Sequence, residues 1–285
     1  MTLQVLETLP ALRSQRAAWR AAGERLALVP TMGNLHAGHL GLVTQAKAHA
    51  DRVLVTLFVN PSQFGPGEDF ERYPRTLNAD LEALASVGCD AVFIPAVATI
   101  YPEGLPPRTR VCPGPLAEQL CGADRPGHFE GVATVVLRLF NMAEPELALF
   151  GQKDYQQLMI IRQLVEDLAL PIEIVGAPIA RAEDGLALSS RNGYLTAAQR
   201  ALAPALHRAL RALAEGPGGT WVERCEGARQ ALEAQGFLVD YLTVRRQADL
   251  ASPEADDSAL IALVAAKLGS TRLIDNLCFT RKDAP

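Results

Sequence analysis

Short apolar segments that alternate with segments of helical period are the feature that most constrains the fold of this chain. Five apolar segments follow one another between Leu26 and Ile179, at residues 26–30, 52–59, 91–95, 147–151 and 172–175. Helical periodicity lies between them, at about 38–50, 77–87, 132–141 and 154–168. Strands that are apolar on both faces and separated by helices are typical of a mostly parallel sheet. The sequence therefore predicts an α/β fold with a Rossmann-like, doubly wound parallel sheet.

A second pattern begins after Leu195. Residues 196–215 are predicted to form one long Ala/Leu/Arg helix with Thr196 as its cap, and the Gly-Pro-Gly-Gly segment 216–219 is expected to end it. A second helix is expected over 221–235, and strands are expected at 237–246, 259–267 and 272–280, with an exposed loop at 251–258. We therefore predict two domains, a larger one over 1–178 and a smaller α+β domain over 179–285.

Composition restricts the class of protein. Hydrophobic residues make up 49% and charged residues 21% of the chain, which is ordinary globular usage. A net charge of −5 argues against a nucleic-acid partner. The five cysteines include no Cys-x-x-Cys pair, so they indicate neither a disulfide framework nor a zinc knuckle. No basic leader and no apolar run of about 20 residues is found, so we expect a cytoplasmic enzyme with no membrane partner.

The segment from Pro30 to His39 follows the first buried strand and opens a helix. Such a turn directs backbone N–H groups and the positive end of a helix dipole toward one point, which suits an anion. His36 and His39 are three residues apart, so both imidazoles can face the same ligand. The alternative is an ordinary helix start with one capping histidine. A zinc site is a weaker alternative because no third ligand has a suitable spacing.

Three further segments carry chemical groups near strand ends or at the domain junction. In the segment 151–157, Lys153 suits a phosphate and Asp154 suits a helix cap or a metal ion, although a capped helix with a solvated lysine explains the pattern equally well. Leu188-Ser189-Ser190-Arg191-Asn192 offers two hydroxyls and a guanidinium for a polyphosphate, but it also resembles many surface turns. Asn60 and Gln63 follow the second buried strand and suit a small polar substrate.

These segments match a known family. The chain resembles the pantoate–β-alanine ligases (pantothenate synthetases) over nearly its whole length and, more distantly, the nucleotidyltransferase superfamily with the His-x-Gly-His signature. His-Ala-Gly-His at 36–39 indicates only the superfamily. The more specific motifs are Phe-Val-Asn-Pro-x-Gln-Phe at 58–64, Arg-Tyr-Pro-Arg-Thr at 72–76, Arg-Pro-Gly-His-Phe-x-Gly-Val at 125–132, Phe-Gly-Gln-Lys-Asp-Tyr-Gln-Gln at 150–157, and Asp-Gly-Leu-Ala-Leu-Ser-Ser-Arg-Asn at 184–192.

The resemblance implies a two-step reaction. The carboxylate of pantoate attacks the α-phosphate of ATP to give pantoyl adenylate and pyrophosphate, and the amine of β-alanine then displaces AMP. It implies that the domain over 1–178 binds ATP and pantoate, that the domain over 179–285 closes over the active site, and that the enzyme is a homodimer. The segment 65–73 would be a lid that excludes water.

The resemblance also implies roles for individual residues. The catalytic residues would be His39 as the favoured proton donor, His36, Lys153, Ser189, Ser190 and Arg191. ATP would contact Met32, Gly33, Asn34, Leu35, His36, Ala37, Gly38, His39, Gly151, Gln152, Lys153, Asp154, Ala180, Leu188, Ser189, Ser190 and Arg191. Gln63 would bind pantoate and β-alanine, Gln157 would bind pantoate, and Asn60, Arg125 and His128 would lie around the amine site and the pyrophosphate exit. The required Mg²⁺ would be carried by the ATP phosphates, with Asp154 as a possible ligand.

Two other functions compete with this one. An adenylyltransferase acting on a phosphorylated substrate would need extra cations, and it leaves the pair of Gln63 and Gln157 unexplained. A nucleotide sensor without catalysis would not need the intact set of His36, His39, Lys153 and Arg191.

Overall fold

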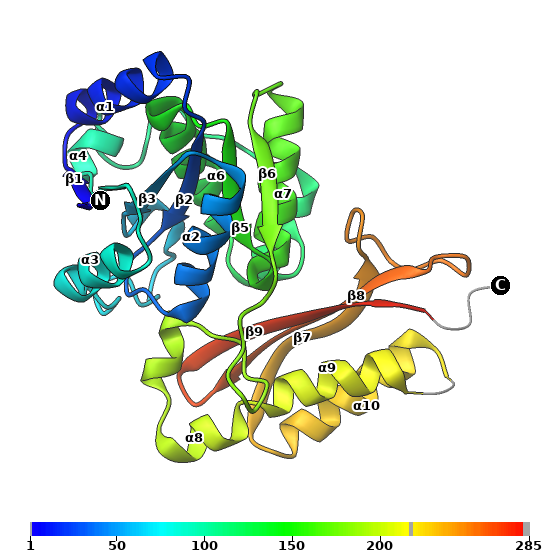
Figure 1. Ribbon diagram of the computed structural model, residues 1–285. Helices are drawn as coiled ribbons and strands as arrows, with labels where there is room; N and C mark the ends of the chain where they lie inside the picture. Colours follow the sequence, from blue (N-terminus) through cyan, green and yellow to red (C-terminus); the bar gives the residue numbers. More distant parts are fainter. Residues whose placement is uncertain (1, 217–218, 282–285) are drawn as a thin grey trace. The chain divides into compact units, whose positions relative to one another are not determined.

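The computed structural model describes residues 2–216 and 219–281 (Figure 1). It contains two compact units. The first unit comprises the chain up to Gln152 together with Gln157–Pro178, and the second unit comprises Lys153–Gln156 together with the chain from Ile179 onward. The four residues Lys153–Gln156 thus pack with the second unit, although the strand before them and most of the helix after them belong to the first.

The first unit is built on a six-stranded sheet in the order β1-β4-β3-β2-β5-β6, in which all strands are parallel (Figure 1). The strands are β1 (Gln4–Leu6), β2 (Leu26–Thr31), β3 (Arg52–Leu57), β4 (Ala91–Phe93), β5 (Leu147–Gly151) and β6 (Glu173–Ala177). The helices are α1 (Leu9–Ala21), α2 (Ala37–His49), α3 (Leu77–Ser86), α4 (Val97–Ile100), α5 (Cys121–Asp124), α6 (His128–Ala143) and α7 (Tyr155–Asp167). The Rossmann-like class predicted from the sequence is confirmed.

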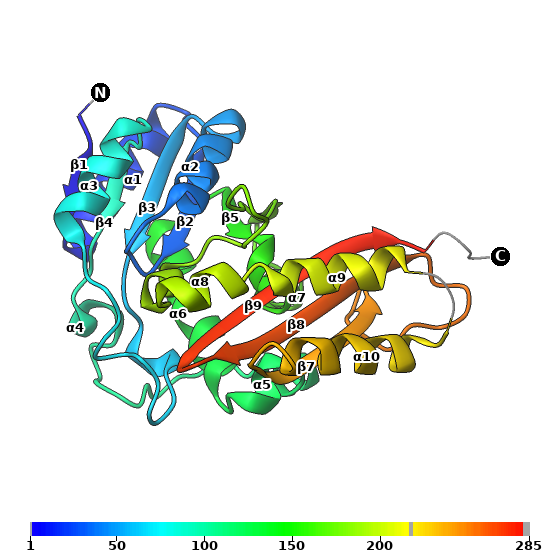
Figure 2. The same cartoon turned by 90° about the horizontal axis from the view of Figure 1, so that it is seen from below.

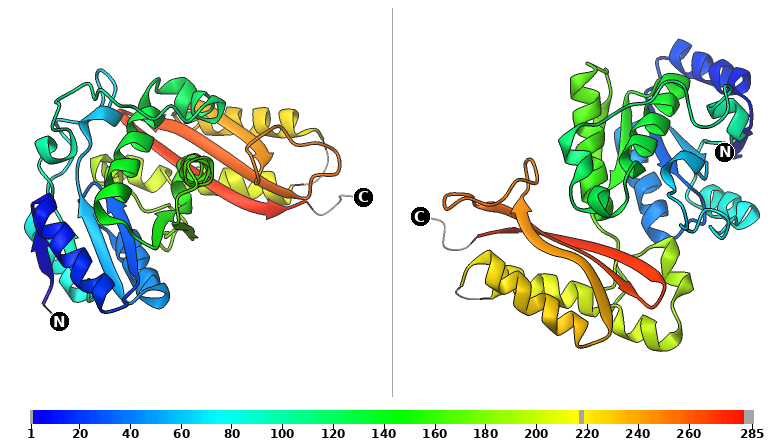
Figure 3. Two further views of the ribbon diagram at one scale, coloured as in Figure 1. Left: turned by 90° about the horizontal axis from the view of Figure 1, so that it is seen from above. Right: turned by 180° about the vertical axis from the view of Figure 1, so that it is seen from behind.

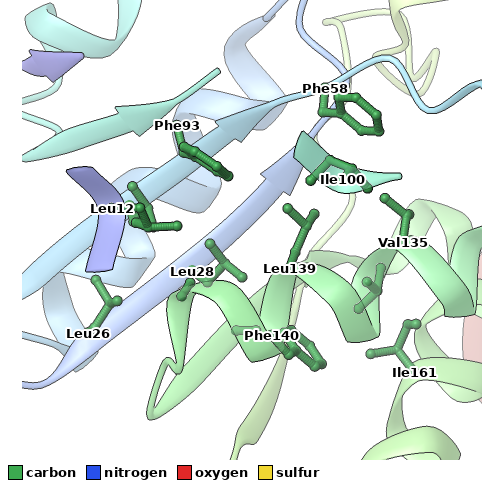
Figure 4. Packing of buried hydrophobic residues seen from close by; sticks show 14 of the residues in the cluster. Leu12, Leu26, Leu28, Phe58, Phe93, Ile100, Val135, Leu139, Phe140 and Ile161 are labelled. Carbon is green, nitrogen blue, oxygen red and sulfur yellow. The ribbon is translucent and has the colours of Figure 1, made fainter. Parts of the chain in front are cut away.

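Successive residues of the central strand β2 enter opposite layers of the core. Leu26 and Leu28 pack with residues of α1, α4, α6 and α7 in one hydrophobic cluster (Figure 4). Ala27 and Val29 pack with residues of α2 and α3 in a second cluster. Both faces of the strand are therefore buried, which explains why its sequence is a continuous apolar run rather than an alternating one.

The order of the strands determines where a ligand site is expected in this unit. The chain passes from β2 to β3 and β4 on one side, and it then crosses to β5 and β6 on the other side of β2. The sheet therefore reverses its strand order between β2 and β5, which are hydrogen-bonded neighbours. Ligands of such sheets bind beyond the carboxyl ends of the strands at this reversal. The carboxyl end of β2 leads into the segment 32–39, and β5 ends at Gly151, which is followed by Gln152.

The second unit is an antiparallel sheet covered on one face by helices. Its strands β7 (Phe237–Arg246), β8 (Ala259–Leu268) and β9 (Thr271–Thr280) have the order β7-β8-β9. The helices α9 (Ala205–Glu215) and α10 (Trp221–Glu233) lie side by side along this sheet (Figures 2 and 3). Their buried leucines pack on Leu260, Val264 and neighbouring residues of β8. The smaller α+β fold predicted for this part of the chain is confirmed.

Two parts of the secondary-structure prediction differ from the structure. The single helix expected over 196–215 is two helices, α8 (Ala197–Leu202) and α9, because Pro204 has no N–H to continue the helix and its ring opposes the preceding turn. Thr196 caps α8, as expected. The elements β1, α1, α4 and α5 were not predicted, although Thr8 and Pro10 provide a typical start for α1.

Other expected segments agree with the structure or lie partly outside it. Residues 251–258 form the expected loop without helix or strand. The predicted helix stop at 216–219 lies partly outside the described residues. Among the residues that the structure describes, no helix combines the length and the apolar character needed to cross a membrane.

Candidate functional site

The turn after β2 is held by a carboxylate that the sequence did not indicate. Gly33 and Asn34 both adopt positive φ, of 81° and 51°. Asp80 of α3 is 3% exposed, and its carboxylate accepts hydrogen bonds from the backbone N–H groups of Asn34 at 2.9 Å and Leu35 at 2.8 Å. The hydroxyl of Thr76 donates a third bond to Asp80 at 3.1 Å. A buried acid 46 residues away in sequence therefore fixes the shape of the turn.

His36 and His39 form a reciprocal cap at the start of α2. The N–H of Gly38 donates to Nδ1 of His36 at 3.1 Å, and the N–H of His36 donates to Nδ1 of His39 at 3.3 Å. The two rings contact each other with centroids 4.0 Å apart and planes inclined by 31°. Because each Nδ1 accepts a hydrogen bond, the neutral form of each ring carries its proton on Nε2. In its neutral form each imidazole is therefore a donor through Nε2 and an acceptor through Nδ1.

The backbone N–H groups of this turn are largely engaged within the protein. Those of Asn34 and Leu35 bond Asp80, and those of His36 and Gly38 bond the two imidazoles. The sequence suggested that these N–H groups themselves would bind an anion. In the structure, these four N–H groups donate to acceptors of the protein itself.

A buried polar network follows β3. Asn60 is 1% exposed, and its amide donates to Oε1 of Gln63 at 3.0 Å and to the carbonyl of Gly131 at 3.2 Å. Its Oδ1 accepts from the hydroxyls of Tyr101 at 2.7 Å and Ser62 at 3.0 Å. Burial raises the pKa of Tyr101, so its hydroxyl remains a donor at neutral pH. The side chain of Asn60 is thus used to hold Gln63.

Gln63 connects this network to the turn after β2 and to α6. Its amide Nε2 contacts Sδ of Met32 at 3.3 Å. Its backbone carbonyl accepts from Nδ1 of His128 at 2.8 Å, and Nε2 of that histidine accepts from Arg125 at 2.9 Å. The structure therefore brings together five candidates from three sequence motifs in the first unit, which are Met32, Asn60, Gln63, Arg125 and His128.

Glu68 is a further member of this group that sequence analysis missed. Its carboxylate makes a two-bond ion pair with Arg125, with both N–O distances 2.6 Å. Burial raises the pKa of Glu68, but the hydrogen bonds and the charge of Arg125 outweigh burial and hold this pKa below its usual value. Glu68 lies in the segment 65–73 that was predicted to be a lid, and its ion pair anchors that segment to Arg125.

The carboxyl end of β5 supplies candidates to both units. In the first unit, Gly151 ends the strand beside Ala177, and Gln152 donates to the carbonyl of Gly176 at 3.3 Å. In the second unit, the ammonium of Lys153 lies 3.5 Å from the carboxylate of Asp154. The carbonyl of Lys153 accepts from Nδ2 of Asn276 in β9 at 2.9 Å.

The remaining candidates lie on one hairpin of the second unit. The backbone of Leu188 donates to Ala180 at 2.9 Å, and Arg181 pairs with Ala187, so residues 180–188 fold back on themselves. Ser189 follows and caps the short turn that begins at Ser190, because its hydroxyl accepts from the N–H of Arg191 at 3.3 Å. The hairpin thus places Ala180 and Leu188 beside each other, directly before the serines and Arg191.

A buried ion pair anchors this hairpin to β9. The two terminal guanidinium nitrogens of Arg181 donate to the carboxylate of Asp275, at 2.7 and 2.9 Å, and Asp275 is 4% exposed. Burial lowers the pKa of the nearby His207, and the charge of Arg181 lowers it further. A neutral His207 does not compete with Arg181 for Asp275. Arg181 and Asp275 were not among the predicted site residues, because their pairing spans 94 positions.

The described residues contain no group of three or more His, Cys, Asp or Glu side chains arranged to hold a metal ion. A divalent cation at this site would therefore depend mainly on oxygen atoms that a ligand supplies.

Comparison with known proteins gives a consistent result over the whole chain. A family model described as "Pantoate-beta-alanine ligase" matches residues 4–278. The pantothenate synthetases of Ectopseudomonas mendocina (strain ymp) and Stenotrophomonas maltophilia (strain K279a) are 54% and 55% identical to this chain. The alignments cover 96% and 97% of this chain and 98% and 100% of those proteins.

Solved structures agree with these sequence matches. The crystal structure of the pantothenate synthetase from Thermus thermophilus matches with a TM-score of 0.89 and 46% identity, over 96% of this chain and 99% of that one. A pantoate-beta-alanine ligase from Francisella tularensis, complexed with beta-gamma ATP and beta-alanine, matches with a TM-score of 0.83 and 33% identity, over 96% and 97%.

Proposed function

This chain belongs to the pantoate-beta-alanine ligase family, and from that premise we propose that it condenses pantoate with β-alanine at the expense of ATP. In the first step, a carboxylate oxygen of pantoate attacks the α-phosphorus of ATP, and the bond to the β-phosphate breaks to release pyrophosphate. In the second step, the amine of β-alanine attacks the acyl carbon, AMP leaves, and the amine loses a proton. The observation that carries the proposal is the family match, because it spans both units of the chain.

His36 and His39 are the proposed hydrogen-bond donors to the phosphates. Their Nδ1 atoms accept backbone N–H groups, which supports a neutral ring with its proton on Nε2. Such a ring stabilises the negative charge that develops on the pentacoordinate phosphorus by donating a fixed hydrogen bond. His39 remains the proposed proton donor of the two.

Lys153, Ser189, Ser190 and Arg191 are the proposed phosphate ligands of the second unit. Lys153 supplies a compact charge and Arg191 supplies a forked set of donors, which is the combination expected for a polyphosphate. The backbones of Ala180 and Leu188 are proposed to meet the adenine. Their shared hydrogen bond gives this part of the hairpin a defined shape.

Gln63 is the proposed contact for both pantoate and β-alanine, and Gln157 is the proposed second contact for pantoate. The bond that Gln63 accepts from Asn60 and the one that it donates to Met32 support this role because they fix the amide before substrate arrives. Asn60 then acts by holding Gln63. Arg125 and His128 are proposed to lie by the amine site and the pyrophosphate exit, and an anion that bound Arg125 would compete with Glu68.

Mg²⁺ is proposed as the metal that accompanies ATP, and it would be held by the phosphates and by Asp154. The carboxylate of Asp154 is 47% exposed and provides the hard oxygen ligands that Mg²⁺ prefers. Its chemical contribution would be to neutralise phosphate charge. From family membership we also propose a cytoplasmic homodimer, and light scattering on the purified protein would test the dimer.

The test of the proposed function measures pyrophosphate release. Purified protein with Mg-ATP and pantoate is expected to release pyrophosphate, and β-alanine is expected to accelerate turnover and to yield pantothenate. Release that does not depend on pantoate would favour the adenylyltransferase, and no release would favour the nucleotide sensor. A crystal structure with ATP would test the site directly, because the two histidines and the Ser189–Arg191 segment must then contact one triphosphate.

A further inference from the structure

Asn276 of β9 is a buried side chain that links two candidate ATP-binding segments of the second unit. It is 2% exposed, and its Nδ2 donates to the carbonyl of Lys153 at 2.9 Å. Its backbone carbonyl accepts from Arg181 at 3.1 Å. One residue of the sheet therefore contacts both the turn that carries Lys153 and the hairpin that leads to Ser189–Arg191.

The neighbouring ion pair gives Asn276 a fixed position. The carboxylate of Asp275 accepts the backbone N–H of Asn276 at 2.8 Å and both terminal guanidinium nitrogens of Arg181. Arg181 also donates to the carbonyl of Gly185 at 3.0 Å, at the turn of the hairpin. Because Asp275 and Asn276 are both nearly inaccessible to solvent, these bonds are not weakened by exchange with water.

We propose that Asn276 is a positioning residue for the adenylation step, and that its amide sets the placement of Lys153 relative to the hairpin through the Lys153 carbonyl. The inference rests on the proposed function, since it takes Lys153 to act on the phosphates. Asn276 itself is too deeply buried to touch a substrate. Its effect on the reaction therefore passes through Lys153.

The chemistry of the bond explains why an amide is needed. The carbonyl of Lys153 requires a donor, and asparagine supplies one from a short side chain. An alanine removes this donor, and a leucine replaces it with an apolar group of similar size. In both cases the turn at Lys153 is released from β9, and displacement of a reacting group by about 1 Å can cost about 100-fold in rate.

The experiment is a double-mutant cycle on the full-length protein with Lys153→Ala, Asn276→Ala and the combined variant, measured by pantoate-dependent pyrophosphate release. Asn276→Ala is expected to lower kcat about 10- to 100-fold, with the KM for pantoate within about 3-fold. In the Lys153→Ala background, the same substitution is expected to change kcat by less than about 3-fold. Asn276→Leu serves as a second variant should the alanine variant fold poorly.

Asp240→Asn is the matched control, because it removes the negative charge from a partly buried ion pair between Asp240 and Arg272 of the same sheet, and neither residue touches the candidate segments. It is expected to leave adenylation unchanged. An equal loss of kcat from Asn276→Ala in both backgrounds would overturn the inference and leave the proposed function standing. Normal adenylation by Lys153→Ala would instead remove Lys153 from the proposed function, and the inference would fall with it.

Discussion

Replacing Asp80 by asparagine tests whether this carboxylate shapes the turn after β2. The carboxylate bonds two backbone N–H groups, of Asn34 and Leu35, at 2.9 and 2.8 Å. An asparagine keeps one acceptor oxygen and places an NH₂ group against the other N–H. The backbone N–H that faces the NH₂ group is left without an acceptor, which costs about 1–3 kcal/mol of stability. The other hydrogen bond becomes weaker by about 1 kcal/mol because its acceptor is no longer charged. The free energy of unfolding of the first unit should therefore fall by about 2–4 kcal/mol.

The measurement uses the two tryptophans of the chain, which lie in different units. Trp19 is buried in the core of the first unit, so a Trp221→Phe background leaves its fluorescence as a probe of that unit alone. Urea unfolding then gives the midpoint and the slope. Asp51→Asn is the matched control, because Asp51 accepts a solvent-exposed hydrogen bond from the N–H of Arg25. This substitution should lower the free energy of unfolding by less than about 1 kcal/mol. An unchanged midpoint and slope for Asp80→Asn would refute the argument.

Three further predictions follow from contacts already described. His39→Ala should lower the rate of pyrophosphate release at least ~100-fold in rapid-quench assays, and a normal rate would remove His39 from the mechanism. Because the folded pKa of Glu68 lies below its ordinary value of 4.5, this carboxylate stabilises the fold above that pH and loses its contribution as the pH falls through the folded pKa. Glu68→Gln should therefore be less stable than the parent at pH 7 but should lose less stability on acidification, as measured by urea unfolding; parallel pH profiles would contradict this. Burial raises the pKa of Cys89 to about 12, so a thiol reagent should label it only after unfolding, and mass spectrometry of labelled peptides checks this.

The fold was predictable because its determinants are local in sequence. The run 52–59 is apolar after Arg52 except for Thr56, which is 1% exposed, so its burial on both faces follows from its composition. The end of α8 before Pro204 was not predicted, because the helical spacing of the leucines continues on both sides of this proline. The prediction followed the leucine spacing rather than the proline. Local patterns therefore fix the class of structure better than the ends of its elements.

The candidate site was only partly predictable, because its supporting residues act across long sequence separations. His36 and His39 were found from their spacing. Asp80 holds the turn before these histidines, but nothing in the sequence around it distinguishes it from other acidic residues on helices. Asn60 was expected to bind substrate, but its bonds to Tyr101, Ser62 and Gly131 depend on segments that meet only in the folded chain. A sequence pattern identifies groups that suit a ligand, and tertiary contacts decide which of them support the others.

The assignment of Lys153–Gln156 to the second unit has a consequence for dissecting the protein. The polypeptide passes from one unit to the other after Gln152, returns after Gln156 and passes again after Pro178. A gene fragment that stops at codon 178 would encode four residues without their packing partners, among them Lys153, whose carbonyl accepts from Asn276, and Tyr155, whose hydroxyl donates to the carbonyl of Gln247. The C-terminal unit is therefore not a cassette that can be excised or exchanged at one cut, and transplanting it between homologues requires that this tetrapeptide travel with it.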